Sequence, residues 1–169
     1  MKAANGYRFQ VAMIASSEEV IRHTISAQMK KTCRRRDSLV PVRTLIIDDS
    51  PFARRIIRHH LEKMGCKVIG EADNAAQGLA MFENLKPELV TLDVMMPEAG
   101  GVNSLTAFRA MKQQSPDVAI VVVTVIPYDK TRDTFLEEGA IGYILKPFNQ
   151  YSFEPIRLKL LRVFRELTA

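Results

Sequence analysis

The sequence predicts an α/β fold in which five parallel strands form one doubly wound sheet with helices on both faces. Apolar runs typical of short buried strands alternate five times with segments of helical periodicity between residues 42 and 169. Strands that alternate with helices run parallel, because each helix returns the chain to the same edge of the sheet. Polar residues follow the apolar runs, as expected where ligands bind outside the carboxyl ends of the strands.

The first predicted unit starts with the apolar run LII at residues 45–47. Ser50 and Pro51 are typical of a helix start, and Gly65 follows the predicted helix end. Four apolar residues recur at helical spacing and are expected to face the core: Phe52, Ile56, Ile57 and Leu61.

The second unit has a predicted strand at residues 67–71 and a helix at residues 74–85, which ends before Pro87. Its inward stripe is expected to be Ala75, Leu79 and Phe82. The other three predicted strands are residues 89–92, 118–124 and 141–145. The other three predicted helices are about residues 103–113, 129–138 and 153–167.

Five polar residues lie at the ends of these strands: Asp48, Asp49, Asp93, Thr124 and Lys146. Because they lie at one edge of the sheet, three carboxylates, a hydroxyl and an ammonium are expected to converge. Each pair of carboxylates repels by roughly 4 kcal/mol at about 4 Å and an effective dielectric of about 20. A cation is therefore expected to share the pocket, or one acid to stay protonated. The set suits a divalent cation and a phosphoryl group.

The composition favours a soluble cytoplasmic protein. Apolar residues make up 47% of the 169 residues, but no stretch approaches the roughly 18 to 20 apolar residues of a membrane span. The apolar run at residues 11–15 has charged neighbours and is a poor secretory signal. Cys33 and Cys66 lack CxxC spacing, which favours free thiols.

Charge separates a basic N-terminal extension and linker, residues 1–41, from a predicted domain at residues 42–169. The first segment has 8 Lys and Arg against 3 Asp and Glu, a net charge of +5, whereas the second has 16 of each. Ser16 and Glu19 form a capping box that follows a strand-like segment and precedes a short apolar helical stripe. Such a stripe cannot bury itself, so we expect a homodimer, a docked partner or packing on the same chain.

The linker carries a basic run: Lys30, Lys31, Arg34, Arg35 and Arg36. No aromatic residues interleave with these cations and no recognition helix is evident. A solvated linker is therefore favoured over nucleic-acid binding. A steep salt dependence of binding to generic duplex DNA would reverse this interpretation.

The motifs LIIDDS, LVTLDVMMP, VVVT and GYILKPF occur in order, and with them residues 42–169 resemble the receiver domain of bacterial two-component response regulators. The resemblance implies a flavodoxin-like (βα)5 fold in a stand-alone, chemotaxis-regulator-like protein. It also implies that Asp93 accepts a phosphoryl group from a histidine kinase or phosphotransfer protein. The implied cofactor is Mg²⁺, held by Asp48, Asp49, Asp93 and the backbone carbonyl of Met95.

The resemblance implies further roles for single residues. Lys146 would neutralise a phosphoryl oxygen, and Thr124 and Tyr143 would be the switch residues. The chain is then not an enzyme, but a phospho-acceptor that assists its own phosphorylation and dephosphorylation. The printed chain ends directly after the fifth predicted helix. We therefore expect its output to be contact with an unknown downstream protein through the fourth helix, fifth strand and fifth helix.

Some residues depart from the family pattern. Val125 is branched where relatives commonly have Ala or Gly, and is expected to narrow access to Asp93. Met95 and Ile126 are apolar at positions that can orient water, which leads to the hypothesis of slow dephosphorylation. The alternative function is therefore a phosphorylation-independent adaptor or dimerisation module, best supported by Val125. The intact acidic set favours the switch, because an adaptor has no need of three mutually repelling carboxylates.

The first predicted helix carries a basic surface near the acidic site. Its arginines are expected to serve in kinase docking: Arg54, Arg55 and Arg58. His59 and His60 are expected to be solvated.

Overall fold

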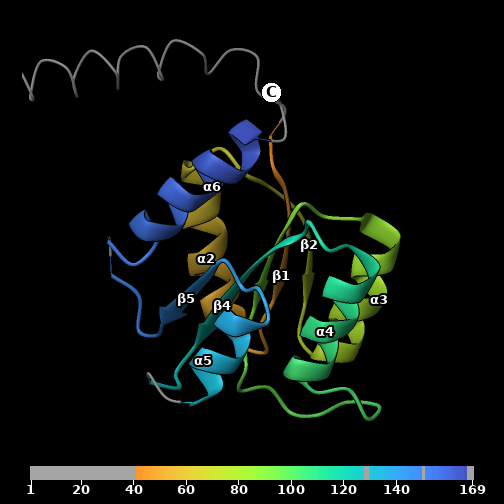
Figure 1. Ribbon diagram of the computed structural model, residues 1–169. Coiled ribbons are helices and arrows are strands. Elements are labelled where there is room, and N and C mark those ends of the chain that lie inside the picture. Colours follow the sequence, from red (N-terminus) through yellow and green to blue (C-terminus); the bar gives the residue numbers. More distant parts are fainter. Residues whose placement is uncertain (1–40, 128–129, 150, 167–169) are drawn as a thin grey trace, which may run out of the picture. The chain divides into compact units, whose positions relative to one another are not determined.

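The computed structural model describes residues 41–127, 130–149 and 151–166, with side chains up to residue 160 (Figure 1). The predicted N-terminal strand and helix, the basic linker and Cys33 lie outside these residues. Within the described ranges, strands and helices alternate along the chain. The α/β fold predicted from the sequence is confirmed.

The strands form one parallel sheet with the order β2-β1-β3-β4-β5. Their bounds are β1 Arg43–Ile47, β2 Lys67–Ala72, β3 Leu89–Leu92, β4 Ala119–Thr124 and β5 Gly142–Leu145. From β1 the chain first adds β2 on one side and then returns to add β3 on the other. The carboxyl ends of β1 and β3 therefore lie side by side at the point where the strand order reverses.

Helices cover both faces of the sheet (Figure 1). Their bounds are α2 Pro51–Lys63, α3 Ala75–Leu85, α4 Ser104–Gln114, α5 Lys130–Glu137 and α6 Glu154–Glu166. Helices α3, α4 and α5 pack on one face, and α2 and α6 pack on the other. None of the helices in the described ranges is long and apolar enough to cross a membrane.

Side chains alternate along the strands and divide the core into two layers. On β1, Leu45 and Ile47 belong to the layer with α3, whereas Ile46 belongs to the layer with α2. Strands β3 and β4 are buried along their whole length because helices cover both of their faces. Gly78 lets α3 approach the sheet closely, since a Cβ there would lie 2.5 Å from Ile47 Cδ1.

Polar caps set where three helices begin. Ser50 caps α2, Asn74 caps α3 and Asn103 caps α4, and each side chain accepts a hydrogen bond from the amide three residues later. The helices expected from residues 74 and 103 therefore begin one residue later, with the Asn as cap. These helices follow β1, β2 and β3, so each begins after the carboxyl end of a strand.

The expectation that Phe52 faces the core is wrong. Phe52 is 72% exposed, whereas Ala53, Ile57 and Leu61 are buried. These three residues are spaced four apart and form the inward face of α2. Phe52 lies about 100° around the helix from Ala53 and so falls outside that face.

His59 is exposed, and His60 is partly exposed. The His60 ring stacks on Phe153, directly before α6, with centroids 4.6 Å apart and an interplanar angle of 12°. Burial lowers the pKa of His60, and the nearby charges of His59 and Lys63 lower it further. The stack connects α2 to the start of α6.

Candidate functional site

The acidic residues converge where β1 and β3 leave the sheet. Asp48 follows β1, and its amide donates to the Ala72 carbonyl at 3.0 Å. Asp93 follows β3, and its amide donates to the Ile47 carbonyl at 2.9 Å. One carboxylate oxygen each of Asp48, Asp49 and Asp93 lies within 4.8 Å of the others. The sheet thus brings together three residues that are up to 45 positions apart in the chain.

The three carboxylates differ in their environment. Asp48 and Asp93 are almost completely buried, at 0% and 3% exposure, whereas Asp49 is exposed. Burial raises the pKa of Asp48, and the attraction of the Lys146 ammonium opposes this rise. The cluster has one side that is closed by the protein and one that faces solvent.

Lys146 reaches the acids from the end of β5. Its Nζ donates a hydrogen bond to Asp93 Oδ2 at 2.6 Å and lies 2.6 Å from Asp48 Oδ2. Its backbone amide donates to the Thr124 carbonyl at 2.8 Å, which fixes its place beside β4. Burial alone would lower the pKa of Lys146, but the two carboxylates raise it overall. The ammonium is therefore charged and bridges two buried acids.

The two oxygens of Asp48 have different partners. Asp48 Oδ1 accepts a hydrogen bond from the Ser50 amide at 3.0 Å. Asp48 Oδ2 is buried and forms an ion pair with Lys146, but no hydrogen bond of acceptable geometry satisfies it. Buried oxygens that lack a hydrogen bond are uncommon and often lie where an ion or water binds. The all-oxygen set fits Mg²⁺, which prefers carboxylate, carbonyl and water ligands.

The Asp93 carboxylate is held in one orientation. Asp93 Oδ1 accepts from the Met95 amide at 3.0 Å, while Oδ2 accepts from Lys146. The backbone carbonyl of Asp93 accepts a hydrogen bond of 2.7 Å from the buried Ser104 hydroxyl at the start of α4. Sequence reasoning missed Ser104, since a serine at a helix start has the ordinary interpretation of a capping residue.

Thr124 and Tyr143 contact the backbone of the same residue. The buried Thr124 hydroxyl accepts a hydrogen bond from the Ile126 amide at 3.4 Å. The Tyr143 hydroxyl donates to the Ile126 carbonyl at 3.0 Å, and its ring is partly buried. The two residues are therefore linked through the loop that follows β4.

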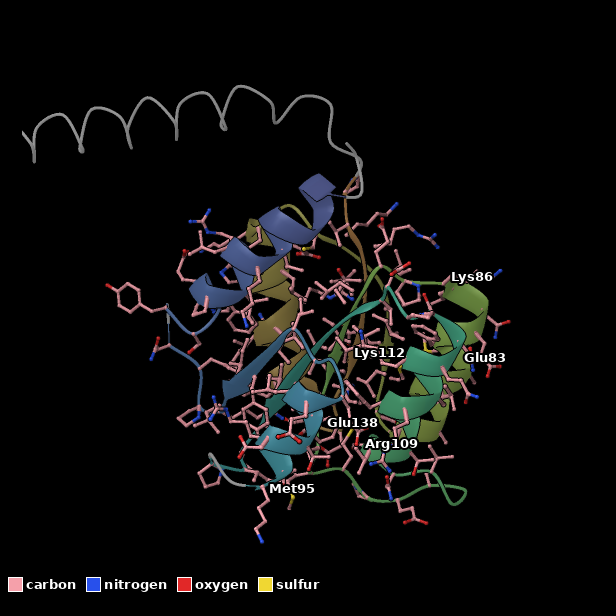
Figure 2. The ribbon with its side chains drawn as sticks, viewed as in Figure 1. Glu83, Lys86, Met95, Arg109, Lys112 and Glu138 are labelled. Carbon is pink, nitrogen blue, oxygen red and sulfur yellow. The ribbon has the colours of Figure 1, made fainter. Side chains whose placement is uncertain are left out.

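Large apolar side chains are exposed at the carboxyl edge. Met95 is 56% exposed and Val125 is 57% exposed. The exposed Phe52 lies in the first turn of α2, directly after the loop that carries the acids. Figure 2 labels Met95, which follows β3 by three residues. The side chains of Met95 and Val125 thus add apolar surface to the region around the acids.

The three arginines of α2 differ in their contacts and exposure. Arg54 and Arg58 both form ion pairs with Glu71 of β2. Arg55 is exposed. Two of the three arginines that were expected to dock a kinase are thus engaged within the domain.

Comparison with known proteins identifies the family. The family model described as "Response regulator receiver domain" matches residues 44–154. The chemotaxis protein CheY of Bacillus subtilis (strain 168) is 35% identical over 106 residues, covering 63% of this chain and 86% of that protein. A CheY-like receiver domain structure from Methanospirillum hungatei JF-1 has a TM-score of 0.65 at 27% identity, covering 75% of this chain and 99% of the other.

The chain belongs to the response regulator receiver family of two-component systems, which confirms the resemblance stated above. Some relatives are much longer than the matched part. A protein-glutamate methylesterase/protein-glutamine glutaminase of Alkalilimnicola ehrlichii is 36% identical over 121 residues, covering 70% of this chain but 30% of that protein. The similarity to that protein is therefore confined to a fraction of its length.

Proposed function

We propose that this protein is a cytoplasmic, phosphorylation-controlled switch that accepts a phosphoryl group on Asp93 from a histidine kinase or phosphotransfer protein. The observation that carries the proposal is the Lys146 ammonium, which lies 2.6 Å from oxygens of both Asp48 and Asp93 at the acidic edge. The buried carboxylate is the nucleophile, and the charged lysine beside it can pair with a phosphoryl oxygen.

In the proposed reaction an oxygen of Asp93 bonds to phosphorus as the phosphorus–nitrogen bond of the donor histidine breaks. The Met95 amide and Lys146 hold the Asp93 carboxylate before the attack. Lys146 then neutralises a phosphoryl oxygen. Asp48, Asp49, Asp93 and the Met95 carbonyl would hold Mg²⁺. When bound, the ion would neutralise charge on the transferred group.

The switch would use the hydrogen bonds at Ile126. The Thr124 bond to the Ile126 amide is 3.4 Å long, beyond the usual range of about 2.7 to 3.2 Å, and is therefore weak. A phosphoryl group on Asp93 offers the Thr124 hydroxyl a charged acceptor, which is a stronger partner. Movement of Thr124 would free the loop and alter the Tyr143 contact, and so change the surface of α5, β5 and α6 that contacts a downstream protein.

A second candidate is a phosphorylation-independent adaptor. The exposed Met95 and Val125 favour it, because apolar surface around the acids suits a bound protein. The buried acid pair argues against it, since binding alone does not require repelling carboxylates.

The deciding experiment is the intact mass of the full chain after incubation with a small phosphodonor and Mg²⁺. We expect a gain of one phosphoryl group, which Asp93→Asn and a chelator each abolish. The matched control Asp117→Asn, at an exposed aspartate before β4, keeps the gain. Absence of a gain in folded wild-type protein would favour the adaptor. Loss of the label within seconds would contradict slow dephosphorylation.

A further inference from the structure

Arg54 ties the loop that carries the acids to a neighbouring strand. Its Nη1 donates a 2.7 Å hydrogen bond to the backbone carbonyl of Asp48, and its Nε donates a 3.0 Å hydrogen bond to Glu71 Oε2. The Arg54 side chain is only 19% exposed. One planar guanidinium therefore joins the residue that begins the acidic loop to the side chain of Glu71.

Glu71 is itself fixed. It lies on β2 in register with Ile46 of the adjacent strand β1. Its second oxygen, Oε1, accepts a hydrogen bond of 2.8 Å from Arg58 Nε. Arg54 therefore connects the Asp48 carbonyl to a side chain that is held from two sides.

Asp48 lies directly after β1 and is held by contacts at its amide, its carboxylate and its carbonyl. The Arg54 bond holds its carbonyl, while the Ser50 amide holds its side chain at 3.0 Å. A loop that rotates about this peptide would move the carboxylates of both Asp48 and Asp49. Groups beyond the direct ligands that orient those ligands contribute strongly to metal affinity.

We infer that Arg54 is a positioning residue that holds the Asp48–Asp49 loop in the arrangement that binds Mg²⁺. This inference rests on the proposed function in one respect, namely that the acidic cluster binds the ion. Arg54 itself does not touch the ion or the phosphoryl group. It acts through the Asp48 carbonyl, and its own hydrogen bond to Glu71 orients its guanidinium.

The direction in which the Mg²⁺ affinity changes when Arg54 is replaced distinguishes positioning from direct charge repulsion. A positive charge near a cation site repels the cation, so removal of the Arg54 charge alone would tighten Mg²⁺ binding. Loss of positioning would weaken binding instead. A lysine preserves the charge, but it lacks the planar fork that joins two acceptors in fixed directions.

The test is calorimetric titration of Mg²⁺ into full-length variants. We expect Arg54→Met to bind Mg²⁺ roughly 10- to 100-fold more weakly than wild type. Arg58→Met is the matched control, because it removes an ion pair with the same Glu71 but no contact with Asp48. Arg58→Met, and Arg55→Met as a control for the loss of charge, should bind Mg²⁺ no more weakly than wild type. Arg54→Lys should also bind Mg²⁺ more weakly than wild type, because lysine lacks the planar fork.

Amide hydrogen exchange in metal-free protein gives an independent measure of the same loop. Exchange at the Asp48 and Ser50 amides should be faster in Arg54→Met than in Arg58→Met, because these amides are hydrogen-bonded in the anchored loop. Equal or tighter Mg²⁺ binding by Arg54→Met would overturn the inference and leave the proposed function intact. If wild type binds no Mg²⁺, the proposed function fails. In that case, equal amide exchange in Arg54→Met and Arg58→Met would also overturn the inference that Arg54 holds the loop.

Discussion

Replacement of Lys146 by Met is expected to destabilise the metal-free protein severely, although Met has nearly the length of Lys. The Lys146 side chain is 13% exposed, and its ammonium lies 2.6 Å from oxygens of Asp48 and Asp93. The variant retains two buried carboxylates and removes the cation between them. We therefore expect the free energy of unfolding to fall because the folded state holds uncompensated charge.

Two estimates of the size of this loss agree. Unit charges 4.8 Å apart, the outer limit for oxygens of the cluster, repel by about 3.5 kcal/mol at an effective dielectric of about 20. Breaking a buried ion pair by removing one partner typically costs about 3 to 5 kcal/mol. Domains of this kind have roughly 5 to 15 kcal/mol of stability in total. The variant should therefore remain folded with a much reduced margin.

The assay is urea unfolding at neutral pH with a chelator present. The double variant Asp48→Asn with Lys146→Met should regain part of the lost stability, because the repulsion between two buried carboxylates is gone although Asp93 stays buried without its cation. Mg²⁺ should also restore stability, by about 2.7 kcal/mol at 100 times its dissociation constant. A loss below about 1 kcal/mol in metal-free Lys146→Met would refute the view that the ammonium compensates a buried acid pair.

The pH dependence of this loss has a definite sign. Burial already raises the pKa of Asp48, and removal of Lys146 takes away an interaction that lowers it. The folded variant therefore binds a proton on Asp48 more readily than the unfolded chain does. Stability must then increase as the pH falls towards the raised pKa, so the loss is smaller in mild acid than at neutral pH.

Two further predictions concern a buried hydrogen bond and a stacked histidine. Ser104→Ala should lower the free energy of unfolding by about 1 to 3 kcal/mol, because the buried carbonyl of Asp93 loses its donor. The exposed Thr106→Ala on the same helix should change it by less than about 0.5 kcal/mol, and equal effects in urea unfolding would contradict the assignment. His60→Gln should make the stability less sensitive to acid than that of wild type. Folding lowers the pKa of His60 from 6.5, so the folded state binds this proton less readily and stability is lost as the pH falls below 6.5. Thermal unfolding of both proteins between about pH 7.5 and about pH 5.5 tests this, and parallel curves would contradict it.

Much of the fold was predictable because its signals are local. The strands β3 and β4 are continuous apolar runs, and Ser50 with Pro51 marks the start of α2. Helix faces were less predictable. Apolar residues at helical spacing placed Phe52 in the core, but only the contact with the sheet shows that Ala53 faces inwards. A helix offers several apolar stripes, and its neighbours decide which one is buried.

The candidate site likewise combines residues that the sequence predicts with contacts that it does not. The polar residues after the strands were evident in the sequence, because βα order alone brings the carboxyl ends of strands to one edge. The supporting contacts were not evident. Arg54 and Glu71 are 17 residues apart and Ser104 lies 11 residues from Asp93, and no pattern of spacing predicts these hydrogen bonds.

By itself, the sequence determined the order of strands and helices and the identity of the acids and lysine at one edge, because burial and backbone periodicity act over short segments. Only the tertiary structure decided which buried oxygens Lys146 contacts and which arginine holds the acidic loop. The Lys146 contacts depend on the order of the strands in the sheet, and the Arg54 contact depends on where α2 lies relative to the sheet. Side chains far apart in the chain meet only after the helices have packed, so their pairing is a property of the assembled core.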